Sequence, residues 1–191
     1  ALPGVDHVYV APTFSLPEEE STLTSDGELQ PMTSNATTMI GADQLNATGF
    51  TGKGMKVAIL DTGIVVDHPN FGALSEDKLT ESSLTKEGVD AIWNTLNAGQ
   101  MTSLRNRSYY NSKLPFIFNY YTRDFDVSHA TAQHDHGTHV AGIAAANRYV
   151  PHYDADGDLY YDKQELGVTG VAPDAQLVVM KVFGVGGGAY S

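Results

Sequence analysis

The feature that most constrains the fold is a nearly continuous apolar run at residues 55–61 (Met-Lys-Val-Ala-Ile-Leu-Asp), which ends on a carboxylate and is followed by Thr62 and Gly63. Such runs are typical of strands in a parallel sheet, because helices cover both faces of that kind of sheet. A second run, residues 177–183, has the same character. The sequence therefore predicts buried parallel strands at both places.

Helices are expected to alternate with these strands. Residues 116–121 predict a third strand, and helices are predicted at 40–50, 88–97 and 136–147, the last rich in Ala and Gly and expected to be buried. Residues 148–166 are expected to form a polar insertion. This alternation predicts an α/β fold, a doubly wound, mostly parallel sheet flanked by helices.

Composition excludes several classes of protein. Eleven Lys and Arg residues against 23 Asp and Glu residues give a formal charge of −12, which argues against nucleic acid or an anionic membrane as a partner. The chain has no cysteine, which excludes disulfides and thiolate chemistry. No segment approaches the roughly 18 consecutive apolar residues of a membrane span.

The Asp61-Thr62-Gly63 triplet is the first candidate for chemistry. A carboxylate at the carboxyl end of a parallel strand stands where open α/β sheets place their active sites. The same three letters occur in aspartic proteases, and an aspartate at a strand end can simply cap the next turn. This triplet alone leaves all three interpretations open.

The second candidate is the segment 136–139 (His-Gly-Thr-His), which opens the predicted small-residue helix. His136 is expected to act as a general base, with a buried carboxylate fixing its tautomer. Gly137 leaves room beside the imidazole ring, and Gly142 is expected to let the helix pack tightly on the sheet. His139 is predicted to be a buried histidine, hydrogen-bonded inside the fold.

Together, the two motifs closely resemble the subtilisin-like serine peptidases. Residues 57–64 are similar to the aspartate motif of that family and residues 136–142 to its histidine motif. Residues 170–173 (Gly-Val-Ala-Pro), ahead of 177–184, resemble the segment that leads into the substrate-binding strand. The resemblance covers about residues 40–191 and implies a serine endopeptidase.

It also implies roles for individual residues. Asp61 would be the orienting acid of an Asp-His-Ser triad, and His136 its general base and acid. The glycines Gly186, Gly187 and Gly188 would pair with the substrate backbone, and Phe183 would line the pockets for residues upstream of the scissile bond. Without the resemblance, the glycines would be interpreted as a flexible loop.

A narrower resemblance concerns residues 116–120 (Phe-Ile-Phe-Asn-Tyr) and 144–147 (Ala-Ala-Ala-Asn). Both are similar to the cell-envelope subgroup that includes the lactocepins and the streptococcal C5a peptidases. This resemblance implies a long, secreted protein of a Gram-positive bacterium, extracellular or associated with the cell envelope, that acts on proteins or peptides.

The resemblance also bears on how the chain is organised. The nucleophilic serine and the oxyanion-hole asparagine of the family are not found and are expected beyond Ser191, so residues 39–191 are expected to be the N-terminal part of a catalytic domain, with an incomplete fold and no activity alone. The remaining part of that domain, possible as a second chain, is its expected partner. Residues 1–16 are interpreted as the tail of an inhibitory propeptide and 17–38 as an acidic arm or maturation junction. An ordinary N-terminal arm is the alternative, and no strand is expected within 11–38.

An acidic segment in the insertion suggests calcium. Carboxylates at Asp154, Asp156, Asp158 and Glu165 match positions 1, 3, 5 and 12 of an EF-hand-like loop, although Leu159 stands where that loop has glycine. A solvated acidic loop is the alternative. No cofactor is expected for catalysis.

Three other functions remain open at this stage. An aspartic protease would use Asp61 in an all-β fold. A metallohydrolase could use His134, His136 and His139 with Asp61. A degenerate subtilase-like module could bind peptides without cleaving them.

Overall fold

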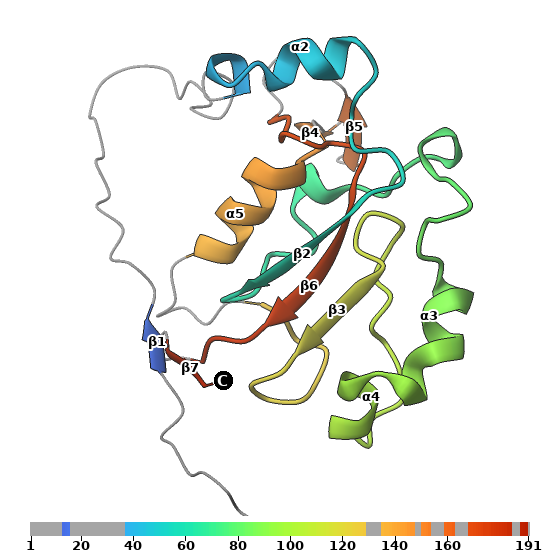
Figure 1. Ribbon diagram of the computed structural model, residues 1–191, viewed down its shortest axis with the longest axis vertical. Coiled ribbons are helices and arrows are strands. Elements are labelled where there is room, and N and C mark those ends of the chain that lie inside the picture. The colour runs from blue at the N-terminus through green and yellow to red at the C-terminus, as the bar shows by residue number, and fades with distance from the viewer. Residues whose placement is uncertain are drawn as a thin grey trace, which may run out of the picture.

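A three-stranded parallel sheet forms the centre of the computed structural model, which describes residues 13–15, 37–128, 135–147, 150–153, 159–162, 168–184 and 188–190 (Figure 1). Its strands lie in the order β2 (Lys56–Asp61), β6 (Gln176–Lys181), β3 (Phe116–Asn119). The three apolar runs of the sequence are therefore the three strands, as predicted.

The register of the sheet sets the position of the polar residues at its carboxyl edge. β2 pairs with β6 from Lys56↔Gln176 to Asp61↔Lys181, and β3 pairs with β6 up to Asn119↔Lys181. Asp61, Lys181 and Asn119 therefore lie side by side in one row. All three are buried.

Helix α5 (His136–Ala145) covers one face of the sheet (Figure 1). Its buried residues Ala141 and Ala145 pack in one apolar cluster with Ile59 of β2 and Val179 of β6. The small side chains on this helix allow its backbone to approach the strands closely.

Helices α3 (Lys86–Ile92), η3 (Trp93–Thr95) and α4 (Asn97–Met101) cover the other face of β3 (Figure 1). A second apolar cluster joins Trp93 to Phe116 and Phe118 of that strand. Trp93 and Phe118 meet edge to face, with ring centroids 6.0 Å apart. The sheet thus has helices on both sides, which confirms the predicted α/β class. On the outer strand β2, Leu60 remains 56% exposed.

The helices predicted from the sequence differ in their bounds. The segment 40–50 contains α2 (Ala42–Ala47), and the single helix expected at 88–97 is replaced by α3, η3 and α4. α3 begins earlier than predicted because the Thr85 side chain caps it, accepting a hydrogen bond from the Gly88 amide at 3.1 Å. Two further 3-10 turns follow β2, η1 (Pro69–Phe71) and η2 (Glu76–Lys78).

The insertion at 148–166 contains a β-hairpin that the sequence analysis missed. Strands β4 (Val150–Tyr153) and β5 (Leu159–Asp162) pair antiparallel, with Tyr153 opposite Leu159. Neither strand shows a clear alternation of apolar and polar residues, and β4 contains Pro151, a residue that argues against a strand in sequence-based prediction.

A second antiparallel pair joins the two ends of the chain. β1 (Thr13–Ser15) pairs with β7 (Gly188–Tyr190), with Phe14 opposite Ala189. The expectation that residues 11–38 hold no strand is therefore wrong for these three residues, because a distant partner and not a local pattern makes the strand.

A buried lysine holds the amino edge of the sheet. Lys113 is fully buried, and its ammonium donates hydrogen bonds to the carbonyls of Pro173 at 2.7 Å and Ala175 at 2.6 Å. Burial lowers the pKa of Lys113 to about 7, although nearby Asp174 acts to raise it. Lys113 lies just before β3 in the sequence, so it lies at the opposite end of the sheet from Asp61.

The two glycines of α5 differ in what surrounds them. A Cβ on Gly137 would lie 2.1 Å from the Gly63 carbonyl oxygen and 3.1 Å from Asp61 Oδ1. A Cβ on Gly142 would meet nothing within 4 Å among the described residues. The expectation that Gly142 allows tight packing is therefore wrong. Gly170, which lies against the end of the helix, is the glycine in close contact there.

These surroundings predict opposite effects for the same substitution. In the full-length polypeptide, Gly137→Ala should lower the thermal unfolding midpoint, since overpacking typically costs about 1–3 kcal/mol. Gly142→Ala should raise it slightly, by the equivalent of about 0.5–1 kcal/mol, because alanine favours a helix interior. Calorimetry of both variants checks this, and equal effects would contradict the packing described here.

Candidate active site

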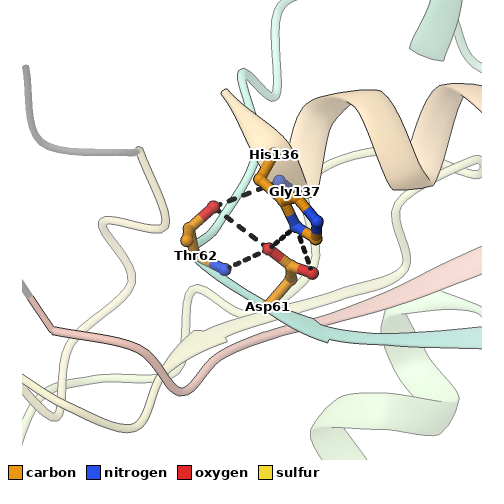
Figure 2. Close-up of polar contacts among 4 residues, drawn as sticks. All are labelled: Asp61, Thr62, His136 and Gly137. Carbon is orange, nitrogen blue, oxygen red and sulfur yellow. Dashed lines mark hydrogen bonds and ion pairs between the residues drawn. The ribbon is translucent and has the colours of Figure 1, made fainter. Parts of the chain in front are cut away.

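Asp61 ends β2 at the carboxyl edge of the sheet, and its side chain is buried beneath the start of α5 (Figure 2). The carboxylate accepts a hydrogen bond from the Thr62 amide at 2.7 Å and one from the Thr62 hydroxyl at 3.2 Å, both to Oδ1. These donors fix the orientation of the carboxylate plane toward the helix.

His136 is the first residue of α5, and its ring meets Asp61 (Figure 2). Nδ1 lies 2.9 Å from both carboxylate oxygens. An ionised carboxylate can only accept a hydrogen bond, so Nδ1 carries the proton of a neutral imidazole. The lone pair is then on Nε2, which is the arrangement that a general base requires. Both residues were predicted from their sequence motifs, and the structure brings them together.

Thr62 connects the two catalytic candidates. Its fully buried hydroxyl donates to Asp61 Oδ1 and accepts a hydrogen bond from the Gly137 amide at 3.1 Å (Figure 2). The hydroxyl therefore bridges the carboxylate and the first turn of α5. The role of Thr62 is not predictable from its sequence motif, because its bond to Gly137 depends on how the helix docks on the sheet.

The turn after Asp61 requires a glycine. Gly63 has φ 103°, and a Cβ there would lie 2.0 Å from the Val127 carbonyl oxygen. The Ile64 amide donates to that same carbonyl at 2.9 Å. The Asp61 turn is thus pressed against the segment that precedes the histidine motif.

The predicted substrate-binding residues lie beyond the end of β6. The half-buried Phe183 and its neighbour Val182 direct their amides at the Asp61 carbonyl, at 3.4 and 3.0 Å. Gly188 lies in β7 and pairs with Ser15. Gly186 and Gly187 lie outside the described residues, so their assignment stays a prediction.

His139 is not the buried histidine that was expected. It is exposed, because it lies about 160° around the helix axis from Ala141, which faces the sheet and is buried. Among the described residues, no three His, Cys, Asp or Glu side chains lie together in a way that could hold a metal ion. His134, which the metallohydrolase alternative uses, lies outside them.

The calcium prediction falls outside the described part of the chain, because its four carboxylates, Asp154, Asp156, Asp158 and Glu165, all lie outside the described residues. Calcium binding stays a prediction.

Comparison with known proteins settles the family. The subtilase family model (peptidase S8) matches residues 52–191. The chain belongs to the subtilase family. This membership, with the parallel sheet, overturns the aspartic protease alternative, whose fold is all-β.

Several characterised relatives are similar to the chain. The PII-type proteinase of Lactococcus lactis subsp. cremoris is 37% identical over 134 residues, which are 70% of this chain and 6% of that protein. The minor extracellular protease Vpr of Bacillus subtilis (strain 168) is 29% identical over 194 residues, 98% of this chain and 17% of Vpr. The major intracellular serine protease of the same strain is 31% identical over 148 residues, 76% of this chain and 29% of that protein.

These relatives bear on the narrower resemblance and on the size of the region compared. Similarity to the lactococcal PI-, PII- and PIII-type proteinases agrees with the predicted cell-envelope subgroup. The chain spans less than a third of the length of each relative described above.

Within the described residues, no helix is both long and apolar enough to span a membrane.

The Thr62 bridge generates a prediction. Thr62→Val should lower kcat roughly 10- to 100-fold in the full-length polypeptide, because it removes a donor to Asp61 and leaves the buried Gly137 amide without its acceptor. Thr62→Ser retains the hydroxyl and should keep kcat within about threefold of the wild type. Steady-state peptide hydrolysis measures both, and equal losses in the two variants would show that the hydroxyl is dispensable.

Proposed function

We propose that this chain supplies the aspartate and the histidine of a subtilisin-like serine endopeptidase. The observation that carries the proposal is the pairing of Asp61 with His136 Nδ1 at 2.9 Å at the carboxyl edge of a parallel sheet, in a chain of the subtilase family. The serine nucleophile and the oxyanion-hole asparagine would follow Ser191 in the full-length polypeptide.

The geometry supports a definite sequence of proton transfers. His136 Nε2 would take the proton of the serine hydroxyl as the serine attacks the peptide carbonyl. Asp61 would stabilise the imidazolium that forms, and that imidazolium would then protonate the leaving amine. The acyl-enzyme would be hydrolysed by water, with His136 again acting as the base. No cofactor takes part in these steps.

The substrates proposed are proteins or peptides, and the location is extracellular or at the cell envelope of a Gram-positive bacterium. Support comes from the names of the similar proteins, which include an extracellular protease of Bacillus subtilis. The major intracellular serine protease of the same strain is also similar to the chain. The proposed location follows the extracellular relative, Vpr.

A fluorophosphonate probe, which labels an activated serine, tests the proposal on the full-length polypeptide. The wild type should label, and His136→Ala should abolish labelling. His139→Ala is the matched control, because His139 is exposed on the same helix, and it should label like the wild type. Asp61→Asn should slow labelling by up to about 10⁴-fold, because it stabilises the wrong tautomer of His136.

Two outcomes would contradict the proposal. A folded wild type that neither labels nor hydrolyses any protein substrate would refute the endopeptidase and favour a non-catalytic binding module. Loss of labelling in both histidine variants would assign the effect to the helix and not to the His136 side chain.

We also propose that residues 1–16 are the end of an inhibitory propeptide, with maturation within residues 17–38. The antiparallel pairing of β1 with β7 supports this, because it sets Ser15 opposite Gly188, one of the glycines assigned to substrate binding. A segment bound in this way would occupy the place of a substrate backbone.

A synthetic peptide of residues 1–16 should therefore inhibit the mature, full-length protease competitively. The matched control carries Phe14→Pro and Ser15→Pro together, which removes the amides needed for strand pairing. The control should inhibit at least about tenfold more weakly. Inhibition that is equal for both peptides, or noncompetitive, would contradict binding through β7.

A further inference from the structure

A buried lysine lies beside the catalytic aspartate, and the proposed mechanism does not use it. Lys181 ends β6, is only 6% exposed and is paired in register with Asp61. Two residues earlier on each strand, Ile59 and Val179 share the apolar cluster under α5. Since side chains alternate along a strand, Asp61 and Lys181 project from that same face of the sheet.

The Lys181 side chain passes beneath the turn that follows Asp61. Its Cδ lies 3.1 Å from the point where Gly63 would carry a Cβ, and its ammonium donates a hydrogen bond to the Ser128 carbonyl at 2.5 Å. Burial lowers the pKa of Lys181, whereas the carboxylates of Asp126 and Asp124 act to raise it. The apolar stem of Lys181 thus packs against the turn, while its ammonium makes a charge-assisted hydrogen bond to a backbone carbonyl.

The segment held by this bond is the one packed against the Asp61 turn. The Asn119 side chain donates to the Asp126 carbonyl at 2.7 Å, and its backbone amide donates to the Asp124 carbonyl at 2.9 Å. One residue before Ser128, the Val127 carbonyl receives the Ile64 amide at 2.9 Å. In the sequence, Ser128 lies seven residues before Asp135, the residue at the N-terminal boundary of α5.

We propose that Lys181 is a positioning residue that holds the 124–128 segment under the Asp61–Gly63 turn and thereby fixes the geometry of the Asp61–His136 pair. One side chain links three parts of the site: the turn that follows Asp61, the 124–128 segment, and the strand end that continues into Phe183. The predicted effect of Lys181 on the rate of peptide hydrolysis rests on the proposed function. The contacts of Lys181 with Ser128 and Gly63 belong to the fold and do not depend on that function.

Lys113 provides a matched control. It too is a buried lysine that donates to backbone carbonyls, but it lies at the amino edge of the sheet. Lys181→Met and Lys113→Met each remove one buried ammonium and keep an unbranched stem. Both variants should unfold at a lower temperature than the wild type, so loss of stability alone does not distinguish them.

Kinetics and hydrogen exchange of the full-length polypeptide distinguish the two variants. Lys181→Met should lower kcat roughly 10- to 100-fold with KM within about threefold, while Lys113→Met keeps kcat within about twofold. The Ile64 amide should lose protection from exchange in Lys181→Met only. Retention of both kcat and Ile64 protection in a folded Lys181→Met variant would overturn the proposal, as would equal losses of kcat in the two variants.

A second variant covers the case in which Lys181→Met does not fold. Lys181→Arg keeps a charged donor, so it should retain Ile64 protection and kcat within about fivefold of the wild type. A folded arginine variant that loses both would overturn the proposal. If the wild type has no activity, the proposed function fails, and the exchange of the Ile64 amide still decides whether Lys181 holds the segment.

Discussion

The site depends on the parallel pairing of β2 with β6. That register sets Asp61 and Lys181 opposite each other at the edge where both strands end, and it directs both side chains under α5. An antiparallel partner would bring the start of a strand to this edge, and the chain would leave in the wrong direction to reach Phe183. A single pairing thus positions the Asp61 carboxylate, the Lys181 ammonium and the path of the chain toward Phe183.

A carboxylate buried this deeply needs hydrogen-bond donors around it, since an unpaired charge in the interior is costly. Asp61 receives them from the Thr62 amide, the Thr62 hydroxyl and His136 Nδ1. The same donors that allow the charge to be buried also define its direction. Structural stability and catalytic orientation are therefore supplied by one set of bonds, and a change to any of them affects both.

The central strands and the Asp61–His136 pair were predictable because local sequence patterns indicate them. The continuous apolar runs predicted β2 and β6, and the aspartate and histidine motifs predicted the Asp61–His136 pair. The expectation that residues 11–38 hold no strand failed because β1 depends on tertiary pairing. β1 forms beside Gly188–Tyr190, and no local pattern in residues 13–15 predicts a strand there.

The helix surface shows the same limit. The small residues of α5 indicated burial, but the sequence did not distinguish Gly137, which lies against Gly63, from Gly142, which no described residue approaches within 4 Å of its Cβ position. His139 is exposed, whereas Ala141, two residues further along the helix, is buried. Thr62 and Lys181 were missed because their roles come from contacts with residues far away in the sequence.

Under the proposed function, the pairing of β1 with β7 also sets how strongly the N-terminal segment inhibits. A segment of the same chain competes with a substrate at an effective concentration set by its tether, on the order of millimolar, and not by its amount in solution. A substrate present at micromolar levels would have to bind far more tightly to displace it. Cutting the connection between Ser15 and the rest of the chain would remove this advantage at once, so one backbone cleavage would convert a resident strand into a ligand that dilutes away.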